Sequence, residues 1–154
     1  DCQQSDIQNC TNEALINTYD NTIAYTDFVL GQIIEVLKHS GIENTQLLYV
    51  SDHGESLGES GLYLHGFPYA LAPQSQTHVP MLYWQNSRPD YAGVAQECDS
   101  KIGTQKLSHD NIFDMLMGMT GVESTAYRQE NNVFSQCDKS LAGILSDYPI
   151  AAAP

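Results

Sequence analysis

The sequence predicts an α/β protein, because a long helical pattern is followed by short apolar runs of strand length. Apolar residues recur at helical spacing over residues 15–37. Residues 46–51 then form an apolar run typical of a strand buried on both faces, and a second strand is expected over residues 79–84. A helix followed by strands favours a layered arrangement of helices and sheet.

Length and charge exclude several classes of protein. The chain has 154 residues, of which 42% are hydrophobic, so it can form one compact core. Six Lys+Arg against nineteen Asp+Glu give a net charge of -13, which argues against nucleic acid as a partner. No run reaches the roughly 20 apolar residues of a membrane helix, and no secretory signal opens the chain. The chain as given is therefore expected to be soluble.

The long helix has recognisable ends. Thr11 and Asn12 are candidate N-terminal caps. Lys38 and His39 suit the negative end of the helix dipole, and Gly41 can adopt the left-handed conformation that stops a helix.

The rest of the chain is less regular. Residues 52–76 are rich in Gly and Pro and are expected to form a structured, functional loop region. Ser108 can cap a helix that runs to about Met119 and ends at Gly121. A short strand is expected around residues 133–134.

The four cysteines do not form a metal-binding spacing. Cys2, Cys10, Cys98 and Cys137 contain no C-x-x-C pair, which leaves disulfides or free thiols. An even count in an acidic chain favours an oxidising compartment, and Cys2 with Cys10 is the most natural local bridge. Four cysteines allow three pairings, so the sequence leaves the connectivity open.

Asp52 and His53 directly follow the first predicted strand, where ligands bind in α/β sheets. Carboxylate and imidazole are both zinc donors, and Gly54 lets the backbone turn sharply enough for them to converge. Glu55 would orient such a ligand or be an ordinary acidic loop residue. The alternative is structural: Asp52 caps a short helix, Glu55 completes the capping box and His53 fills a surface groove.

Further histidines favour the metal site. His65 and His78 lie within or beside the same irregular stretch and are candidates for binding substrate or a second metal, although an isolated loop histidine is more often solvated. His39 and His109 have simpler explanations at helix ends.

Four runs resemble a known family. They are residues 17–22 (Asn-Thr-Tyr-Asp-Asn-Thr), 49–59 (Tyr-Val-Ser-Asp-His-Gly-Glu-Ser-Leu-Gly-Glu), 62–66 (Leu-Tyr-Leu-His-Gly) and 79–82 (Val-Pro-Met-Leu). Together they closely resemble the phosphoethanolamine transferases that modify lipid A, including the mobile colistin-resistance enzymes. The likeness is strong over residues 2–84 and weaker over residues 108–121.

The resemblance implies a sulfatase-like, three-layer α/β/α sandwich of the alkaline-phosphatase superfamily. In this family the domain lies at the periplasmic face of the bacterial inner membrane and is attached to an N-terminal membrane domain. The chain is then expected to be the C-terminal part of one catalytic domain. It would comprise a disulfide loop (1–14), a metal-site core (15–84), peripheral helix and strands (85–140) and a tail (141–154).

The resemblance also implies site residues. Family members hold zinc with a glutamate, a nucleophilic threonine and an Asp-His pair, which aligns with Asp52 and His53. The histidine aligned with His65 binds a second zinc or the phosphoethanolamine head group, which makes His65 a candidate catalytic residue. The family has a disulfide like Cys2–Cys10. Its threonine and glutamate lie upstream of anything aligned here.

The implied function is zinc-dependent transfer of phosphoethanolamine from phosphatidylethanolamine to a lipid A phosphate through a phospho-threonine intermediate. Two alternatives stay open: another transferase or hydrolase of the superfamily, such as a phosphoglycerol transferase or sulfatase, or a catalytically silent fragment or binding module.

Overall fold

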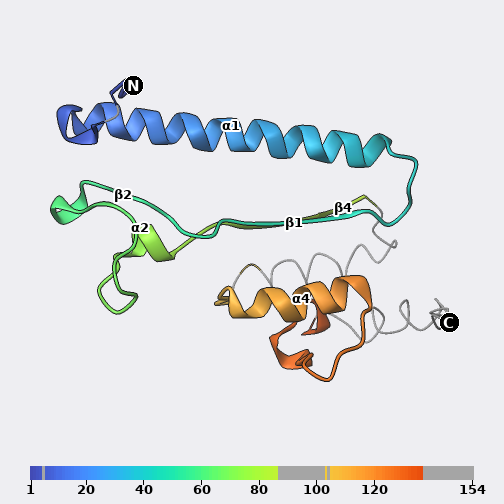
Figure 1. The fold of residues 1–154 in the computed structure, drawn as a ribbon. Helices are drawn as coiled ribbons and strands as arrows, with labels where there is room; N and C mark the ends of the chain where they lie inside the picture. The colour runs from blue at the N-terminus through green and yellow to red at the C-terminus, as the bar shows by residue number, and fades with distance from the viewer. Residues whose placement is uncertain (5, 87–102, 104, 137–154) are drawn as a thin grey trace. The chain divides into compact units, whose positions relative to one another are not determined.

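The computed structural model describes residues 1–4, 6–86, 103 and 105–136 of the chain (Figure 1). The chain divides into two compact units, Asp1–Ser87 and Arg88–Pro154, which we call unit 1 and unit 2.

Unit 1 begins with a disulfide-bonded segment that leads into the long helix. Cys2 and Cys10 are joined by a disulfide around the short 3-10 helix η1 (Ile7–Asn9), which confirms the predicted local bridge. The backbone N–H of Cys2 donates to Oγ1 of Thr18 at 2.7 Å and ties this segment to the helix. Cys98 and Cys137 lie outside the described residues.

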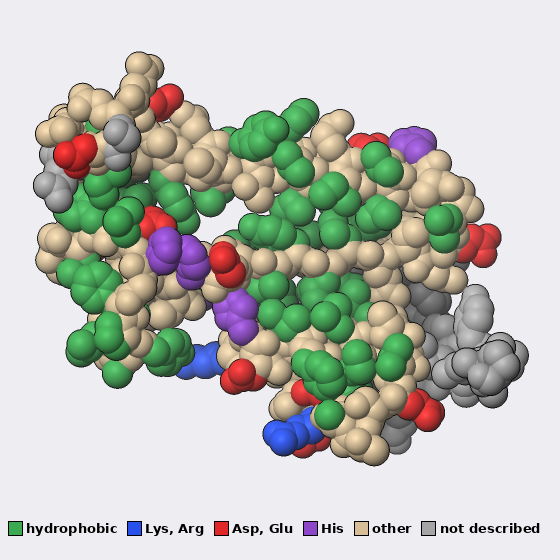
Figure 2. All heavy atoms as spheres, in the orientation of Figure 1, with side chains coloured by type: hydrophobic (Ala, Val, Ile, Leu, Met, Phe, Trp, Pro, Cys, Tyr) green, Lys and Arg blue, Asp and Glu red, His purple; other side chains and the backbone are tan. Residues whose placement is uncertain are grey.

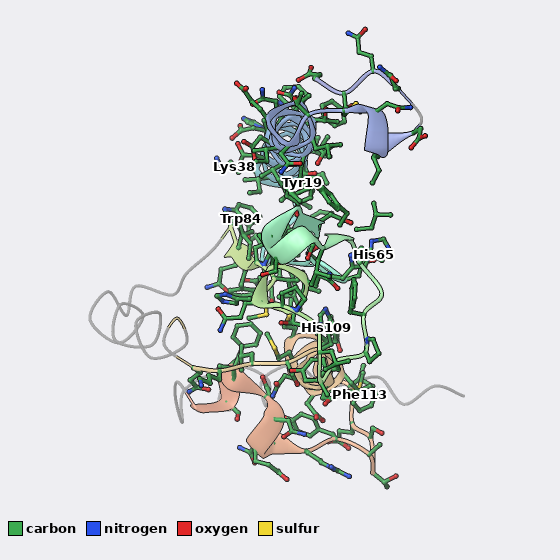
Figure 3. All side chains as sticks on the ribbon, turned by 90° about the vertical axis from the view of Figure 1, so that its left-hand side faces the viewer. Tyr19, Lys38, His65, Trp84, His109 and Phe113 are labelled. Carbon is green, nitrogen blue, oxygen red and sulfur yellow. A yellow bond between two sulfur atoms is a disulfide. The ribbon has the colours of Figure 1, made fainter. Side chains whose placement is uncertain are left out.

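Helix α1 (Asn12–His39) confirms the predicted helix and its ends. Oγ1 of Thr11 caps it by accepting a hydrogen bond from the backbone N–H of Ala14 at 3.2 Å. Gly41 follows the last turn in a left-handed conformation, with φ +72°. Figures 1 and 3 show α1 lying along the strands of unit 1, and Figure 3 places Tyr19 on the side of the helix that faces them.

The two predicted strands pair with each other. β1 (Gln46–Val50) and β4 (Met81–Gln85) are antiparallel, in a register that runs from Gln46 opposite Gln85 to Val50 opposite Met81. The expectation of a strand buried on both faces is wrong for the described residues, because the side chains from Leu47 to Val50 are only half-buried. Among the described residues β1 pairs only with β4, and burial of both faces would need a layer packed on each of them.

The stretch predicted as a structured loop contains small elements. Strands β2 (Ser56–Leu57) and β3 (Tyr63–Leu64) form an antiparallel hairpin around the 3-10 helix η2 (Glu59–Gly61). One helical turn, α2 (Gln74–Thr77), leads back toward β4. Tyr63 donates its hydroxyl to Oδ1 of Asn12 at 2.6 Å, which fastens the hairpin to the start of α1.

The described residues of unit 2 include the helix α4 (Asp110–Thr120), which ends at Gly121 as predicted. The helix begins two residues after Ser108, whose hydroxyl accepts from the backbone N–H of Asp110 at 3.3 Å. The 3-10 helices η3 (Gln129–Asn131) and η4 (Val133–Gln136) pack against it. Met115 and Val133 are buried between these elements.

The predicted strand around residues 133–134 is wrong, because this segment forms η4. Oδ1 of Asn132 accepts from the backbone N–H of Phe134, and the carbonyl oxygen of Asn132 accepts from the backbone N–H of Ser135. These local bonds close a turn, which prevents the extended conformation that a strand requires. The tail over residues 141–154 lies outside the described residues.

Candidate metal centre

The turn that follows β1 carries Asp52 and His53. At its start, Ser51 donates its backbone N–H to the carbonyl oxygen of Pro80 at 3.2 Å. At its end, Gly54 donates its N–H to a carbonyl oxygen of α2 at 2.9 Å. Because both ends of the turn are hydrogen-bonded to the rest of unit 1, Asp52 and His53 occupy a short and fixed segment.

Helix α2 lies so close to this turn that only glycine fits at position 54. A Cβ atom on Gly54 would lie 2.0 Å from the carbonyl oxygen of Ser75, well inside contact distance. Behind it, the fully buried hydroxyl of Ser56 accepts from Nε2 of the buried Gln76 at 2.8 Å and lies 3.2 Å from Oγ of Ser75. This satisfied polar network fixes α2 against the turn.

The hydrogen bond of the His53 ring leaves its other nitrogen available to a metal. Nδ1 of His53 lies 2.9 Å from the carbonyl oxygen of Gly54. A carbonyl oxygen can only accept, so Nδ1 carries the proton and Nε2 of the neutral ring carries a lone pair. Nε2 lies 3.7 Å from Oδ2 of Asp52. Ligand atoms of a tetrahedral zinc ion, with bonds of about 2.0–2.2 Å, lie about 3.4 Å apart, close to this separation.

Asp52 is charged at neutral pH. Its Oδ1 accepts a hydrogen bond from the backbone N–H of His53 at 3.0 Å. This hydrogen bond is the largest cause that holds the pKa of the Asp52 carboxyl below its usual value. The exposed carboxylate is therefore ready to bind a cation.

The β2–β3 hairpin brings Glu55 next to His65. Ser56 pairs with Leu64 in the antiparallel register, so residues 55 and 65, one position beyond this pair, lie opposite each other. Nδ1 of His65 lies 3.1 Å from Oε2 of Glu55. Leu64 has φ +65° and Gly66 has φ +97°, so the backbone has the left-handed conformation on both sides of His65. Figure 3 labels His65 in this segment.

His53, Glu55 and His65 form a group that can hold a metal ion. One ligand atom from each residue lies within 4.8 Å of the other two, and the two imidazole centroids are 3.9 Å apart. Oε1 of Glu55 is buried and has no hydrogen-bond partner among the described residues. A buried carboxylate oxygen without a donor is costly, and a cation would satisfy it. Imidazole nitrogens and carboxylate oxygens together fit zinc.

Comparison with known proteins identifies the family. The profile of the family described as Sulfatase matches residues 1–122. The chain belongs to the sulfatase family. It is 48% identical over 141 residues to phosphoethanolamine transferase EptA of Escherichia coli (strain K12), which covers 88% of this chain and 25% of that protein. It is also 38% identical to phosphatidylethanolamine transferase Mcr-1 of Escherichia coli, over 79% of this chain and 21% of that protein.

A solved structure confirms the predicted sulfatase-like α/β fold. The integral membrane protein lipooligosaccharide phosphoethanolamine transferase A from Neisseria meningitidis superposes with a TM-score of 0.81 at 39% identity. The match covers 88% of this chain and 26% of that structure. The chain therefore spans about a quarter of the length of these relatives. Within the described residues, no helix has the length and apolar character needed to cross a membrane.

In this sulfatase-family chain, the structure brings three of the predicted site residues together. Asp52 and His65 both lie close to the His53 ring, and of these two only His65 belongs to the metal-binding group of described residues. The alternative in which Asp52 caps a helix is not observed, since no helix begins between residues 52 and 55. His78 ends α2, where its backbone N–H donates to the carbonyl oxygen of Gln74 at 2.8 Å, and the metal-binding group of described residues does not include it.

The sequence predicted that Glu55 orients a metal ligand or is an ordinary acidic loop residue. It did not predict Glu55 as a possible ligand. The signal that could have identified it is the spacing His53-Gly54-Glu55, because alternate residues of an extended chain point to the same side. The remaining histidines are placed as expected at helix ends. His39 lies in the last turn of α1, with Nδ1 2.8 Å from the carbonyl oxygen of Glu35, and His109 directly precedes α4.

Proposed function

We propose that this chain carries part of the zinc centre of a phosphoethanolamine transferase, with Asp52 and His53 as ligands. The observation that supports this most directly is the 3.7 Å separation of Nε2 of His53 from Oδ2 of Asp52, with Nδ1 of the same ring hydrogen-bonded to a backbone carbonyl oxygen. These two electron-rich atoms face each other at a distance that suits a shared cation. The names of the similar proteins supply the class of reaction.

The proposed reaction moves phosphoethanolamine from phosphatidylethanolamine to a phosphate of lipid A. A threonine hydroxyl attacks phosphorus and diacylglycerol leaves; the acceptor phosphate then attacks the phospho-threonine and releases the threonine. Bound zinc would lower the pKa of the attacking hydroxyl and offset the charge on the phosphoryl oxygens. The resemblance implies that the threonine and a further glutamate ligand come from another part of the catalytic domain.

We assign His65 a direct role in this reaction. When Glu55 is ionised, its carboxylate accepts a hydrogen bond from the Nδ1–H of His65, which leaves Nε2 to exchange a proton with substrate or to contact the phosphoryl group. His78, at the end of α2, is proposed to contact substrate or a second metal. This role is tested by replacing His78 with alanine and measuring bound zinc in the same way as for the ligand variants.

The partners follow from the same proposal. The lipids named above would be substrates, and no nucleic acid is expected as a partner of a chain with net charge -13.

Several apolar side chains of α1 are exposed, among them Tyr25, Phe28 and Val36, and we propose that another part of the catalytic domain covers them. The Cys2–Cys10 disulfide and the membrane protein among the relatives support a location at the periplasmic face of the inner membrane, next to a membrane domain.

The proposal is tested by measuring zinc bound to purified variants by plasma emission and calorimetry. Asp52→Ala and His53→Ala should each lower zinc affinity at least about tenfold, because each removes a ligand. Asp27→Ala and His39→Ala remove the same side chains from exposed positions on α1 and should retain zinc fully. Equal zinc affinity in all four variants would refute the assignment of the ligands.

The class of reaction needs a separate assay. Labelled phosphatidylethanolamine and phosphatidylglycerol are offered to the chain together with the rest of its catalytic domain. Release of label from phosphatidylethanolamine alone would support the proposed transferase. Preference for phosphatidylglycerol would indicate a phosphoglycerol transferase instead.

A further inference from the structure

The loop between β3 and α2 exposes apolar side chains beside the metal-binding group. We call residues 64–71 the apolar loop; it contains His65. Tyr69 is 86% exposed and Leu71 is 73% exposed, and Leu64 and Phe67 are also exposed. Figure 2 shows hydrophobic side chains gathered over this loop, at the lower left of the view. Side chains of this size are seldom displayed together on a surface that faces only water.

Hydrogen bonds within the backbone of the apolar loop favour its transfer from water into an apolar medium. The carbonyl oxygen of Pro68 accepts from the backbone N–H of Leu71 at 2.8 Å and of Ala72 at 2.9 Å. The loop therefore closes on itself: this carbonyl pairs the N–H of Leu71 and that of Ala72 directly after the loop, while Pro68 has no N–H to satisfy. An unpaired backbone group would be costly in an apolar medium, so this closed turn lowers the cost of entering one.

The absence of charged side chains around the apolar loop also favours its entry into an apolar medium. Residues 62–73 contain no Asp, Glu, Lys or Arg, although the whole chain has a net charge of -13. Charged side chains would have to lose their hydration on entering a bilayer, and this stretch has none to dehydrate. Tyrosine is enriched at membrane–water interfaces, where its ring is buried and its hydroxyl stays hydrated.

We propose that the apolar loop inserts into the surface of a bilayer that contains phosphatidylethanolamine. Apolar faces of helices that lie in a membrane interface are buried about 5–10 Å into the boundary between head groups and acyl chains, and we expect the loop to enter to a similar depth. Because His65 belongs to the loop, insertion brings the metal-binding group to the level of the head-group phosphates. The choice of lipid rests on the proposed function, whereas the insertion rests on the exposure, the closed turn and the absence of charge.

The test measures flotation of the chain with vesicles made of equal parts phosphatidylethanolamine and phosphatidylcholine. The unsubstituted chain should bind. The triple variant Phe67→Ser, Tyr69→Ser, Leu71→Ser should have a partition coefficient at least about tenfold lower, because it removes three apolar side chains from the inserted surface. Replacing phosphatidylcholine by anionic phosphatidylglycerol should weaken binding, because the chain is acidic.

A matched control removes equally exposed apolar side chains elsewhere. Tyr25 and Val36 on α1 are 68% and 69% exposed, and Phe28 lies on the same helix. The triple variant Tyr25→Ser, Phe28→Ser, Val36→Ser should bind vesicles as the unsubstituted chain does. Equal loss in the two triple variants would show unspecific adsorption and overturn the proposal, as would a failure of the unsubstituted chain to bind.

Two further arms separate insertion from head-group binding and from the zinc proposal. Soluble O-phosphoethanolamine should not displace the chain from vesicles; displacement would indicate binding of the head group at the metal site and would overturn insertion. Asp52→Ala should lose zinc affinity and keep vesicle binding, whereas the triple loop variant should keep zinc affinity and lose vesicle binding. If only the zinc result differs from this expectation, the zinc proposal is wrong. If only the vesicle result differs, the insertion proposal is wrong.

Discussion

Gly54 shows how a single residue sets the geometry of the candidate metal site. Its N–H is bonded to α2, and the space that a Cβ atom would need is filled by the Ser75 carbonyl oxygen. Any side chain at position 54 must push α2 away from the turn that holds Asp52 and His53. The absence of a side chain, rather than backbone flexibility, is what the site requires there.

We predict that Gly54→Ala destabilises the folded state by about 1–3 kcal/mol, the usual cost of overpacking a close contact. The variant should also bind zinc less tightly, because the displaced turn moves the ligands. Urea denaturation followed by circular dichroism, together with calorimetry, checks both effects.

The control is Gly31→Ala in the middle of α1, where a Cβ atom would meet nothing within 4 Å. Alanine is the better helix former, so this variant should gain up to about 1 kcal/mol of stability. An unfolding midpoint for Gly54→Ala equal to that of the unsubstituted chain would contradict the packing argument.

At the scale of elements, α4 is held to its neighbours by a buried carboxylate. Asp114 is almost fully buried on α4. It accepts from the backbone N–H of Arg128 at 2.7 Å and from Nδ2 of Asn131 at 2.9 Å. These bonds join α4 to the start and the end of η3.

We predict that Asp114→Ala lowers the local stability of unit 2 by about 1–3 kcal/mol, because it removes a buried carboxylate and leaves its two partly buried donors without this acceptor. Hydrogen exchange of the α4 amides measures this change. Asp114→Asn, which keeps one acceptor oxygen, should have a smaller effect. Asp110→Ala in the exposed first turn removes only a dipole interaction and should cost at most about 1 kcal/mol. Similar losses for positions 110 and 114 would contradict this account.

At the scale of the whole molecule, the excess of acidic side chains opposes folding. Nineteen Asp+Glu against six Lys+Arg leave repulsion that few ion pairs offset. One pair that does, Lys38 with Glu35 at 2.6 Å, lies on the exposed surface of α1. The Lys38 side chain lowers the pKa of Glu35, but solvent screens such pairs strongly.

We therefore predict that sodium chloride stabilises the chain. Raising its concentration from about 0.01 M to about 0.15 M shortens the Debye length from about 30 Å to about 8 Å, which weakens the repulsion between acidic groups over the whole surface. The thermal midpoint should rise, since the loss of the few exposed attractive pairs is smaller. A midpoint that falls with added salt would show that specific ion pairs outweigh net charge.

The sequence by itself determined the elements whose signals are local. The helical spacing, the Thr11 cap and Gly41 fixed the extent of α1, and the apolar runs located β1 and β4 to within two residues. The motif runs pointed to Asp52, His53 and His65 and to the sulfatase family, since spacing along the chain is itself sequence information.

Only the tertiary structure decided which distant residues meet. The pairing of Ser56 with Leu64 places Glu55 against His65, and α2 closes over Gly54, although neither contact has a periodic signal along residues 52–76. The strand expected at residues 133–134 failed for a different, local reason: Asn132 accepts hydrogen bonds from the backbone N–H groups of Phe134 and Ser135, which closes a turn instead of a strand. Hydrogen bonds between residues far apart in the chain depend on how its segments pack, and packing is a property of the folded molecule.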